Sequence, residues 1–284
     1  MKRLRLLLIT AFIFSGFILS SVASATPPPL TPLAPLAPQI PLTPLEPLEK
    51  PEIIIKDIVI PTNPFRKAKE FTVIHKLPNH NTPRAQVDSC DPDSSDATGF
   101  GDAGWQLNSN TVFRVNLSSA PSTIRSNLNS IVANSFGVWD SQTAQVSFSQ
   151  GATTSVSRSR LDYQNVLAWG RLAANTLGLT TIRYFVDTGE VVDVDTIMNS
   201  RVTWTWTNPT TLVAPATSDN TCGDLTKYDA QDILTHEIGH WMGLDDIYSS
   251  SNKDLTMYGY GRKGELKKNT LEPGDILGIQ VLYP

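Results

Sequence analysis

Residues 229–243 of this 284-residue chain read DAQDILTHEIGHWMG, and they are the most informative stretch of the sequence. Acidic residues stand in its first turn and Gly243 stands where a helix needs a left-handed exit, so the stretch predicts a helix. His236 and His240 are four residues apart and therefore share a face, where both imidazoles reach a single Zn²⁺. Glu237 lies beside them and suits the role of general base for a metal-bound water.

The zinc centre needs one more ligand from outside the helix, because catalytic zinc sites hold three protein ligands and keep one position open. Gly243 allows a sharp turn, and Asp246 is the tenth residue after His236. The carboxylate of Asp246 completes a set of two histidines and one aspartate, with Asp245 as the alternative. The motif on its own also fits a helix that carries two solvated histidines.

The chain before this helix shows both strand-like and helix-like patterns. Six tryptophans lie between residues 105 and 241, which indicates that the core is formed there. A helix is predicted behind Pro121 and Ser122, where apolar residues recur at helical spacing from Ile124 to Trp139. Strands are predicted at residues 111–117, 146–148, 165–169, 181–186 and 191–199. This order predicts an α+β domain with a mixed sheet.

Three motifs in the last third of the chain resemble the metzincin zinc peptidases, and within them the matrixin-like peptidases. They are HEIGHWMGLDD at residues 236–246, the Met-turn candidate TMY at residues 256–258, and LEPGDILGIQVLY at residues 271–283. In element order the resemblance extends over residues 110–284. It implies a twisted, mixed five-stranded sheet with an active-site helix and a C-terminal helix.

The resemblance also implies roles for single residues. His236 and His240 would be zinc ligands, Glu237 the catalytic base, and Met257 the apolar floor beneath the metal. The usual third ligand of matrixins is histidine, whereas this chain has Asp246, an arrangement similar to the small snapalysin-type metzincins.

Substrate binding is a further implication of the resemblance. Residues 191–199 look like the family's edge strand, which pairs with an extended protein or peptide substrate by strand addition. Residues 258–268 would form the wall of the pocket that takes the residue after the scissile bond.

The first 89 residues differ in composition from the rest. Residues 1–25 have a positive start, an apolar run and small residues before a cleavage site, which is typical of a secretory signal peptide; an uncleaved anchor helix is the alternative. Residues 26–64 are rich in Pro and Leu, and a proline at every third position predicts a polyproline II linker. Residues 65–89 are interpreted as a propeptide or loose linker, with His75 and His80 solvated.

Short β-like runs interrupt this leader at residues 53–55 and 71–74, but nearby prolines favour a linker. The catalytic domain then covers residues 90–284. Cys90 and Cys222 are the only cysteines, and in an exported chain they are expected to form a disulfide. The alternative is that Cys90 ligates zinc in a latent proenzyme.

Calcium is a second candidate cofactor. Asp91, Asp93 and Asp96 have the spacing of an oxygen-rich cation loop, and Asp193 with Asp195 adds carboxylates elsewhere. Calcium takes six to eight oxygen ligands, which neither group supplies alone. An acidic turn in solvent is the simpler interpretation of the first group.

The charge balance limits the partners. The chain has 23 Lys and Arg against 27 Asp and Glu, a net charge of -4, and so gives no basic footprint for nucleic acid or an anionic membrane. We expect a secreted monomeric zinc endopeptidase, free or associated with the cell surface. The rival hypothesis is a non-catalytic extracellular peptide-binding or adhesion module with a structural zinc, which would have no need of Glu237.

Overall fold

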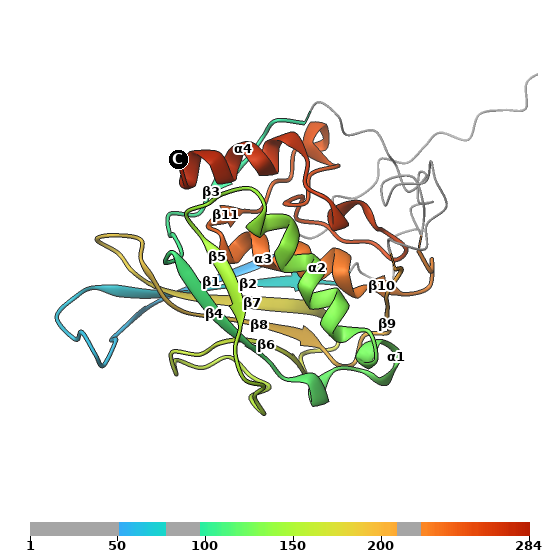
Figure 1. Ribbon diagram of the computed structural model, residues 1–284, viewed down its shortest axis with the longest axis horizontal. Helices are drawn as coiled ribbons and strands as arrows, with labels where there is room; N and C mark the ends of the chain where they lie inside the picture. Colours follow the sequence, from blue (N-terminus) through green and yellow to red (C-terminus); the bar gives the residue numbers. More distant parts are fainter. Residues whose placement is uncertain (1–50, 78–96, 209–222) are drawn as a thin grey trace, which may run out of the picture. The chain divides into compact units, whose positions relative to one another are not determined.

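A seven-stranded sheet is the frame of the part of the chain that the computed structural model describes, residues 51–77, 97–208 and 223–284 (Figure 1). Its strand order is β1-β2-β7-β8-β6-β4-β5, and two pairs of short strands, β9 with β10 and β3 with β11, lie outside it. The strands are β1 (Glu52–Ile58), β2 (Ala68–Lys76), β3 (Gly101–Asp102), β4 (Asn110–Val115), β5 (Ser147–Gln150), β6 (Asn165–Gly170), β7 (Thr176–Phe185), β8 (Val191–Asn199), β9 (Trp204–Thr205), β10 (Tyr228–Asp229) and β11 (Leu244–Asp245).

Five of the seven strands, β4 to β8, form the mixed sheet that the sequence predicts. Strands β5, β4, β6 and β8 run parallel to one another, and β7 runs antiparallel to β8. The α+β class and the mixed sheet are therefore confirmed. The sheet is larger than expected because β1 and β2, which come from the leader, extend it beyond β7.

Two helices, α2 and α3, cover one face of the sheet and enclose the main core (Figure 1). The α-helices are α1 (Ser122–Arg125), α2 (Leu128–Asp140), α3 (Ala230–Trp241) and α4 (Pro273–Leu282), with short 3₁₀ turns at Leu117–Ser119, Ser250–Asn252 and Lys267–Asn269. Trp139 of α2 donates from its indole Nε1 to the carbonyl of Thr235 in α3, at 2.8 Å. Phe136 and Trp241 meet edge to face with ring centroids 5.4 Å apart. These contacts fix α3 against α2.

The ends of α3 follow from single residues. Asp229 is the N-cap, and its carboxylate accepts from the backbone N–H groups of Gln231 and Asp232. The helix ends at Trp241, and Gly243 follows with φ of 90°, a conformation that favours glycine. A side chain at Gly243 would also meet the carbonyl oxygen of Trp105. This turn sends the chain back past the face of α3.

The C-terminal helix α4 supports the loop beneath the active-site helix. Glu272 and Asp275 form a capping box at its start, and Pro273 occupies the first turn. The buried carboxylate of Asp275 accepts from the backbone N–H groups of Thr256 and Met257 at 2.9 and 3.1 Å. The closing helix thereby holds the Met-turn in place.

The edge strand differs from the expectation. Residues 191–199 form β8, which lies between β6 and β7 and is paired on both sides. The two outer strands of the β4 to β8 part of the sheet are β7 and β5, so the assignment of residues 191–199 as the edge was wrong. Strand order depends on how the β7–β8 hairpin places its two arms, and an alternating pattern does not specify that placement.

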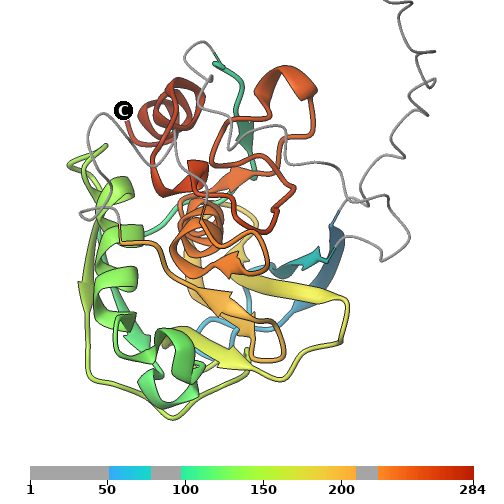
Figure 2. The same ribbon diagram turned by 90° about the vertical axis from the view of Figure 1, so that its right-hand side faces the viewer.

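The leader also differs from the expectation where it is described. Residues 52–58 and 68–76 form the antiparallel strands β1 and β2, not a polyproline II or loose linker. Strand β1 contains three consecutive isoleucines and β2 contains the run from Phe71 to Ile74, residues that favour strands, and the open edge of β7 gives β2 a row of backbone partners. Figure 2 shows the two strands, in blue, on the opposite side from β5. The expected signal peptide lies outside the described residues, as does the linker up to residue 50.

Within the described ranges, no helix has the length and apolar character required to cross a bilayer.

Candidate metal centre

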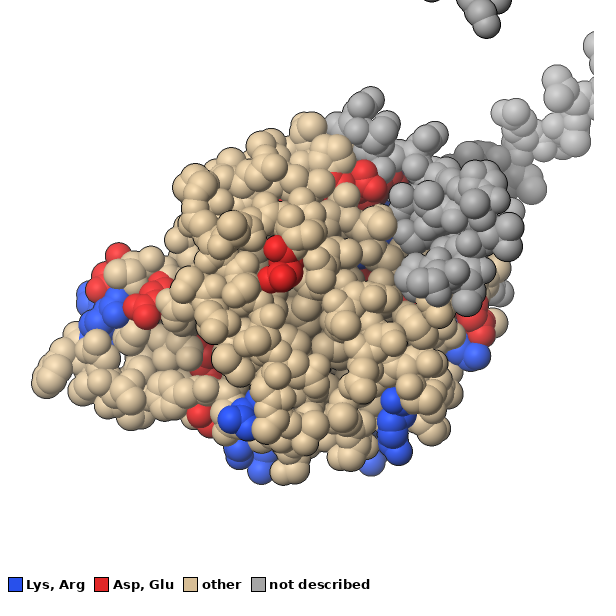
Figure 3. Space-filling view, viewed as in Figure 1, with Lys and Arg blue, Asp and Glu red and all other residues tan. Residues whose placement is uncertain are grey.

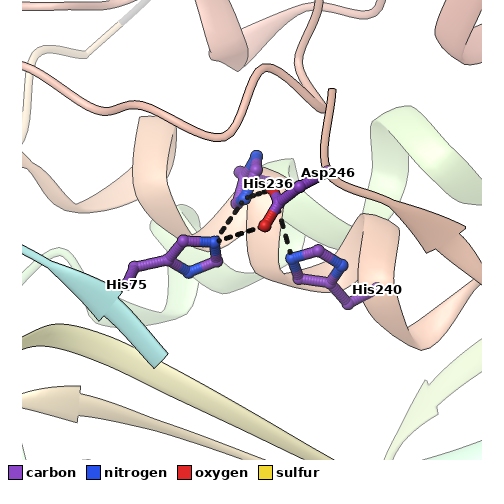
Figure 4. A group of neighbouring side chains, drawn as sticks. All are labelled: His75, His236, His240 and Asp246. Carbon is purple, nitrogen blue, oxygen red and sulfur yellow. Dashed lines mark hydrogen bonds and ion pairs between the residues drawn. The ribbon is translucent and has the colours of Figure 1, made fainter. Parts of the chain in front are cut away.

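Four side chains converge at one point on the surface of α3 (Figure 4). His236 and His240 come from successive turns of α3, Asp246 from the segment after β11, and His75 from the end of β2. One ligand atom from each lies within 4.8 Å of all the others. The structure thus brings together the three predicted ligands and adds a fourth residue.

The two α3 histidines are oriented by backbone carbonyls. His236 Nδ1 lies 2.7 Å from the carbonyl oxygen of Thr256, and His240 Nδ1 lies 2.9 Å from that of Leu244. A carbonyl only accepts, so each Nδ1 carries the proton, and in the neutral ring Nε2 keeps a free lone pair. Both lone pairs therefore face the centre, as metal ligands require.

Two buried atoms of the centre lack hydrogen-bond partners within the described residues: His240 Nε2 and Asp246 Oδ1. Asp246 Oδ1 lies 3.1 Å from His236 Nε2 and 3.7 Å from His240 Nε2. Such separations suit ligands that each bind one ion at about 2.0–2.2 Å. Two imidazoles and a carboxylate are a donor set that zinc prefers, so the residues present fit zinc.

Asp246 and its neighbour Asp245 are clearly distinguished. Asp245 belongs to β11, where it pairs with Gly101, and its Oδ1 accepts from the backbone N–H of Asp246. Asp246 points into the centre and its Oδ2 accepts from the hydroxyl of Tyr248 at 2.9 Å. The geometry favours Asp246, and its role as third ligand stays a prediction.

Glu237 is completely buried beside the four converging residues. Its Oε1 lies 2.7 Å from His75 Nδ1, and its Oε2 accepts from the hydroxyl of Thr180 at 2.5 Å. Thr180 in turn bonds to the hydroxyl of Thr196, which accepts from the indole N–H of Trp241. This chain of donors fixes the carboxylate of Glu237 from the side of the sheet.

The charges of the centre favour an added cation. Burial would raise the pKa of Glu237, but His75 and the other two histidines lower it to about 2. Burial would likewise lower the pKa of His75, yet the carboxylates of Glu237 and Asp246 raise it from 6.5 to about 10. The two carboxylates thus draw a proton onto His75 when no metal is bound, and a metal ion would meet the same demand for positive charge.

Met257 is buried and packs against α3. A side chain at Gly239 would clash with Met257 Sδ, so the absence of one lets the Met-turn pack directly against the helix. Gly239 lies between His236 and His240 in the sequence of α3. The role of Met257 as the floor beneath the metal stays a prediction.

A small pocket opens next to Glu237, lined on one side by Gly259, Gly261 and Lys268. These residues belong to the loop expected to wall the pocket for the residue after the scissile bond. Lys268 is buried, and its ammonium group donates to the carbonyl of Tyr258 and lies 3.4 Å from His236 Nδ1. Burial lowers the pKa of Lys268, while Glu265 opposes the shift.

The structure corrects two expectations about charged groups. His75, expected to be solvated in a linker, is 6% exposed and lies in the metal centre. Asp193 and Asp195 are both bound by the guanidinium of Arg183, so these buried carboxylates have a cation from the chain itself. Cys90, Asp91, Asp93, Asp96 and Cys222 lie outside the described residues, and so does His80.

His75 and Thr180 contact the candidate site and were missed by sequence reasoning, as was Arg183, the cation that binds Asp193 and Asp195. None of the three belongs to a recognised motif. The one available signal for His75 was its position directly after the β-like run at residues 71–74, in a chain with only four histidines.

The family model described as Matrixin (Peptidase M10) matches residues 104–284 of this chain. The matched range contains α3, the Met-turn and α4, and it leaves β1, β2 and His75 outside. No curated protein matches the chain. Matrixins are zinc-dependent endopeptidases, which agrees with the donor set of the centre.

Proposed function

The chain belongs to the matrixin family, and from this premise we propose that it is a secreted zinc endopeptidase in which Glu237 is the general base. The observation that carries the proposal is the buried carboxylate of Glu237 beside three converging ligand atoms. His236, His240 and Asp246 would hold the zinc. When bound, the metal supplies a Lewis acid that polarises the scissile carbonyl and lowers the pKa of water.

Glu237 performs the proton transfers in this proposal. Its carboxylate accepts a proton from the attacking water and then passes it to the nitrogen of the leaving amine. The hydrogen bond from Thr180 keeps one carboxylate oxygen oriented, which leaves Oε1 as the oxygen that moves the proton.

Strand β7 is the proposed binding edge for substrate. It is one of the two outer strands of the β4 to β8 part of the sheet and passes next to Glu237, because the hydroxyl of its Thr180 donates to Glu237 Oε2. An extended peptide laid antiparallel on β7 would gain backbone hydrogen bonds and place one side chain in the pocket at Gly259 and Gly261. The substrate class is therefore a protein or peptide in extended conformation.

Secretion rests on the signal-peptide pattern of residues 1–25.

Figure 3 shows one face of the molecule, on which Lys and Arg do not gather into a single patch. A face without a basic patch suits a peptide substrate better than a polyanion. The rival, a non-catalytic binding module, has no observation in its favour and no use for Glu237.

The test compares cleavage of casein and a mixed peptide library by the zinc-loaded full chain and by Glu237→Gln, with and without a chelator. Because His75 contacts Glu237, both proteins are also made in a His75→Ala background. In the His75→Ala background we expect chelator-sensitive cleavage that Glu237→Gln lowers by about 10²–10⁴-fold while zinc content stays unchanged. Zinc retention without cleavage in either background, and no difference from the Gln variants, would refute the enzyme.

A further inference from the structure

Strand β2 lies where the proposed substrate would lie. It pairs antiparallel with β7 along its whole length, from Ala68 opposite Phe185 to Lys76 opposite Thr176. Backbone groups on the edge of β7 that would hold a substrate are therefore already used. Lys76 and His75 also line the pocket beside Glu237.

His75 connects this strand to both parts of the active centre. Its Nε2 lies 3.2 Å from Asp246 Oδ2 and 3.2 Å from His236 Nε2, among the other ligand atoms. Its Nδ1 lies 2.7 Å from the carboxylate of Glu237. When Nδ1 donates to Glu237, the lone pair of Nε2 is aimed at the same point as those of His236 and His240.

We propose that His75 is a fourth zinc ligand and that strand β2, by filling the edge of β7, keeps this peptidase in a closed, latent form. The inference rests on the proposed function, since latency has meaning only for an enzyme. Four protein ligands complete a tetrahedral zinc site and leave no open position, which is the arrangement of structural sites. The same imidazole engages Glu237, so metal and base are both blocked by one side chain.

Contacts along the leader hold the strand independently of the metal. Glu70 accepts from Arg183 Nε at 2.8 Å, and the ring of Phe71 packs 4.9 Å from that of Trp105. Before the strand, Arg66 bonds to Asp187 and Glu190 in the turn between β7 and β8. The imidazole is therefore presented at high effective concentration by a docked segment of the same chain.

A small zinc chelator tests whether a position is open without any need for catalysis. Acetohydroxamate is titrated into the zinc-loaded full chain, His75→Ala and His80→Ala, and its affinity is measured by calorimetry. The Co²⁺-substituted proteins are followed by visible absorption, which reports coordination. His80→Ala is the matched control, since it removes the other leader histidine five residues away.

We expect wild type and His80→Ala to bind acetohydroxamate alike and weakly, and His75→Ala to bind it at least about 100-fold more tightly. The factor follows if the closed form leaves at most ~1% of the wild-type protein open. The Co²⁺ spectrum of His75→Ala should differ from that of wild type and change again on binding. If His75→Ala binds no metal, Phe71→Ser, which keeps the imidazole and weakens docking, should still raise acetohydroxamate affinity above that of wild type.

Equal acetohydroxamate affinity and equal Co²⁺ spectra in wild type and His75→Ala would overturn the inference, as would the same change in His80→Ala. Cleavage separates this outcome from failure of the proposed function. If His75→Ala opens the metal centre but shows no Glu237-dependent cleavage, the proposed enzyme activity is refuted, and latency with it. The assignment of His75 as a zinc ligand is then still supported. Equal cleavage by wild type and His75→Ala removes latency and keeps the enzyme.

Discussion

Two buried ionic clusters in this molecule are built on opposite principles. In the first, the guanidinium of Arg183 lies 2.6 Å from Asp193 Oδ1 and 3.1 Å from Asp195 Oδ2. In the second, the metal centre, Asp246 Oδ1 and His240 Nε2 are buried without hydrogen-bond partners among the described residues. One cluster contains its own cation, whereas the other presents acceptor atoms to a shared point.

The difference shows how a metal site is distinguished from a structural ion cluster. A group of buried carboxylates is not evidence of a cation site when an arginine reaches them, because a guanidinium supplies the charge and the donors. In His236 and His240 each Nδ1 carries the proton, because it bonds to a backbone carbonyl. The Nε2 atom of the neutral ring is then an acceptor and cannot donate to its neighbours. Of the two clusters, only the second presents unpaired acceptor atoms that a metal ion could join.

The largest expected effect comes from removing the cation of the first cluster. Arg183→Met leaves Asp193 and Asp195 buried without their partner, which should lower the free energy of unfolding by about 3–5 kcal/mol. Arg160→Met is the matched control, since Arg160 is half exposed and its ion pair with Asp162 should contribute only about 0–1 kcal/mol. Chemical denaturation measures both. Equal losses in the two variants would show that Arg183 is not the essential cation.

Substitution of the proposed anionic ligand, Asp246, tests the metal centre. Asp246→Ala should weaken zinc binding by more than about 100-fold, which exceeds the usual effect of a residue that only orients a ligand. Asp245→Ala, one residue earlier, should change zinc affinity little because its carboxylate bonds to backbone. Competition with a chelator gives the affinities. A reversed order would move the ligand assignment to Asp245.

The comparison also shows what the sequence could and could not predict. His236, Glu237 and His240 were predictable because helical geometry alone puts residues at this spacing together. The closing helix was predictable from the resemblance of residues 271–283 to the matrixin closing motif.

Contacts between residues far apart in the chain could not be predicted from the sequence. His75 meets Glu237 across 162 positions of chain, and Arg183 meets Asp193 only because β7 and β8 form a hairpin. No local pattern states which strand lies at the edge. Strand β2 of the leader was not predicted for the same reason, since its partner β7 follows about a hundred residues later.

A smaller effect is expected from the pH dependence of the first cluster. Burial and the neighbouring charge of Asp193 raise the pKa of Asp195 from 3.8 to about 7, against the opposing effect of Arg183. A raised folded-state pKa means that this group favours the folded state most below pH 3.8, and that this contribution is lost as pH rises toward about 7. The free energy of unfolding of wild type minus that of Asp195→Asn should therefore fall over this range. A flat difference would contradict the shift.

The smallest effect concerns the orientation of Glu237. Thr180→Val keeps the branched shape on β7 but removes the hydroxyl that donates to Glu237 Oε2. A hydrogen bond to a charged group is worth about 1.5–3 kcal/mol, so cleavage measured in the His75→Ala background should fall by about 10–100-fold. Loss of a donor to the charged form should also raise the pKa of Glu237 and move the acid limb of the pH profile upward.

Thr181→Val is the control for this orientation. The hydroxyl of Thr181 bonds to that of Thr72 of β2 at 3.1 Å, and the hydroxyl that donates to the base is that of Thr180, so the same change at Thr181 should leave kcat and the pH profile unaltered. A purely structural role for Thr180 would lower the stability of the variant without moving the acid limb. The shift of that limb, present in Thr180→Val and missing in Thr181→Val, therefore assigns the sheet a part in positioning the base, separate from the ligands that hold the metal.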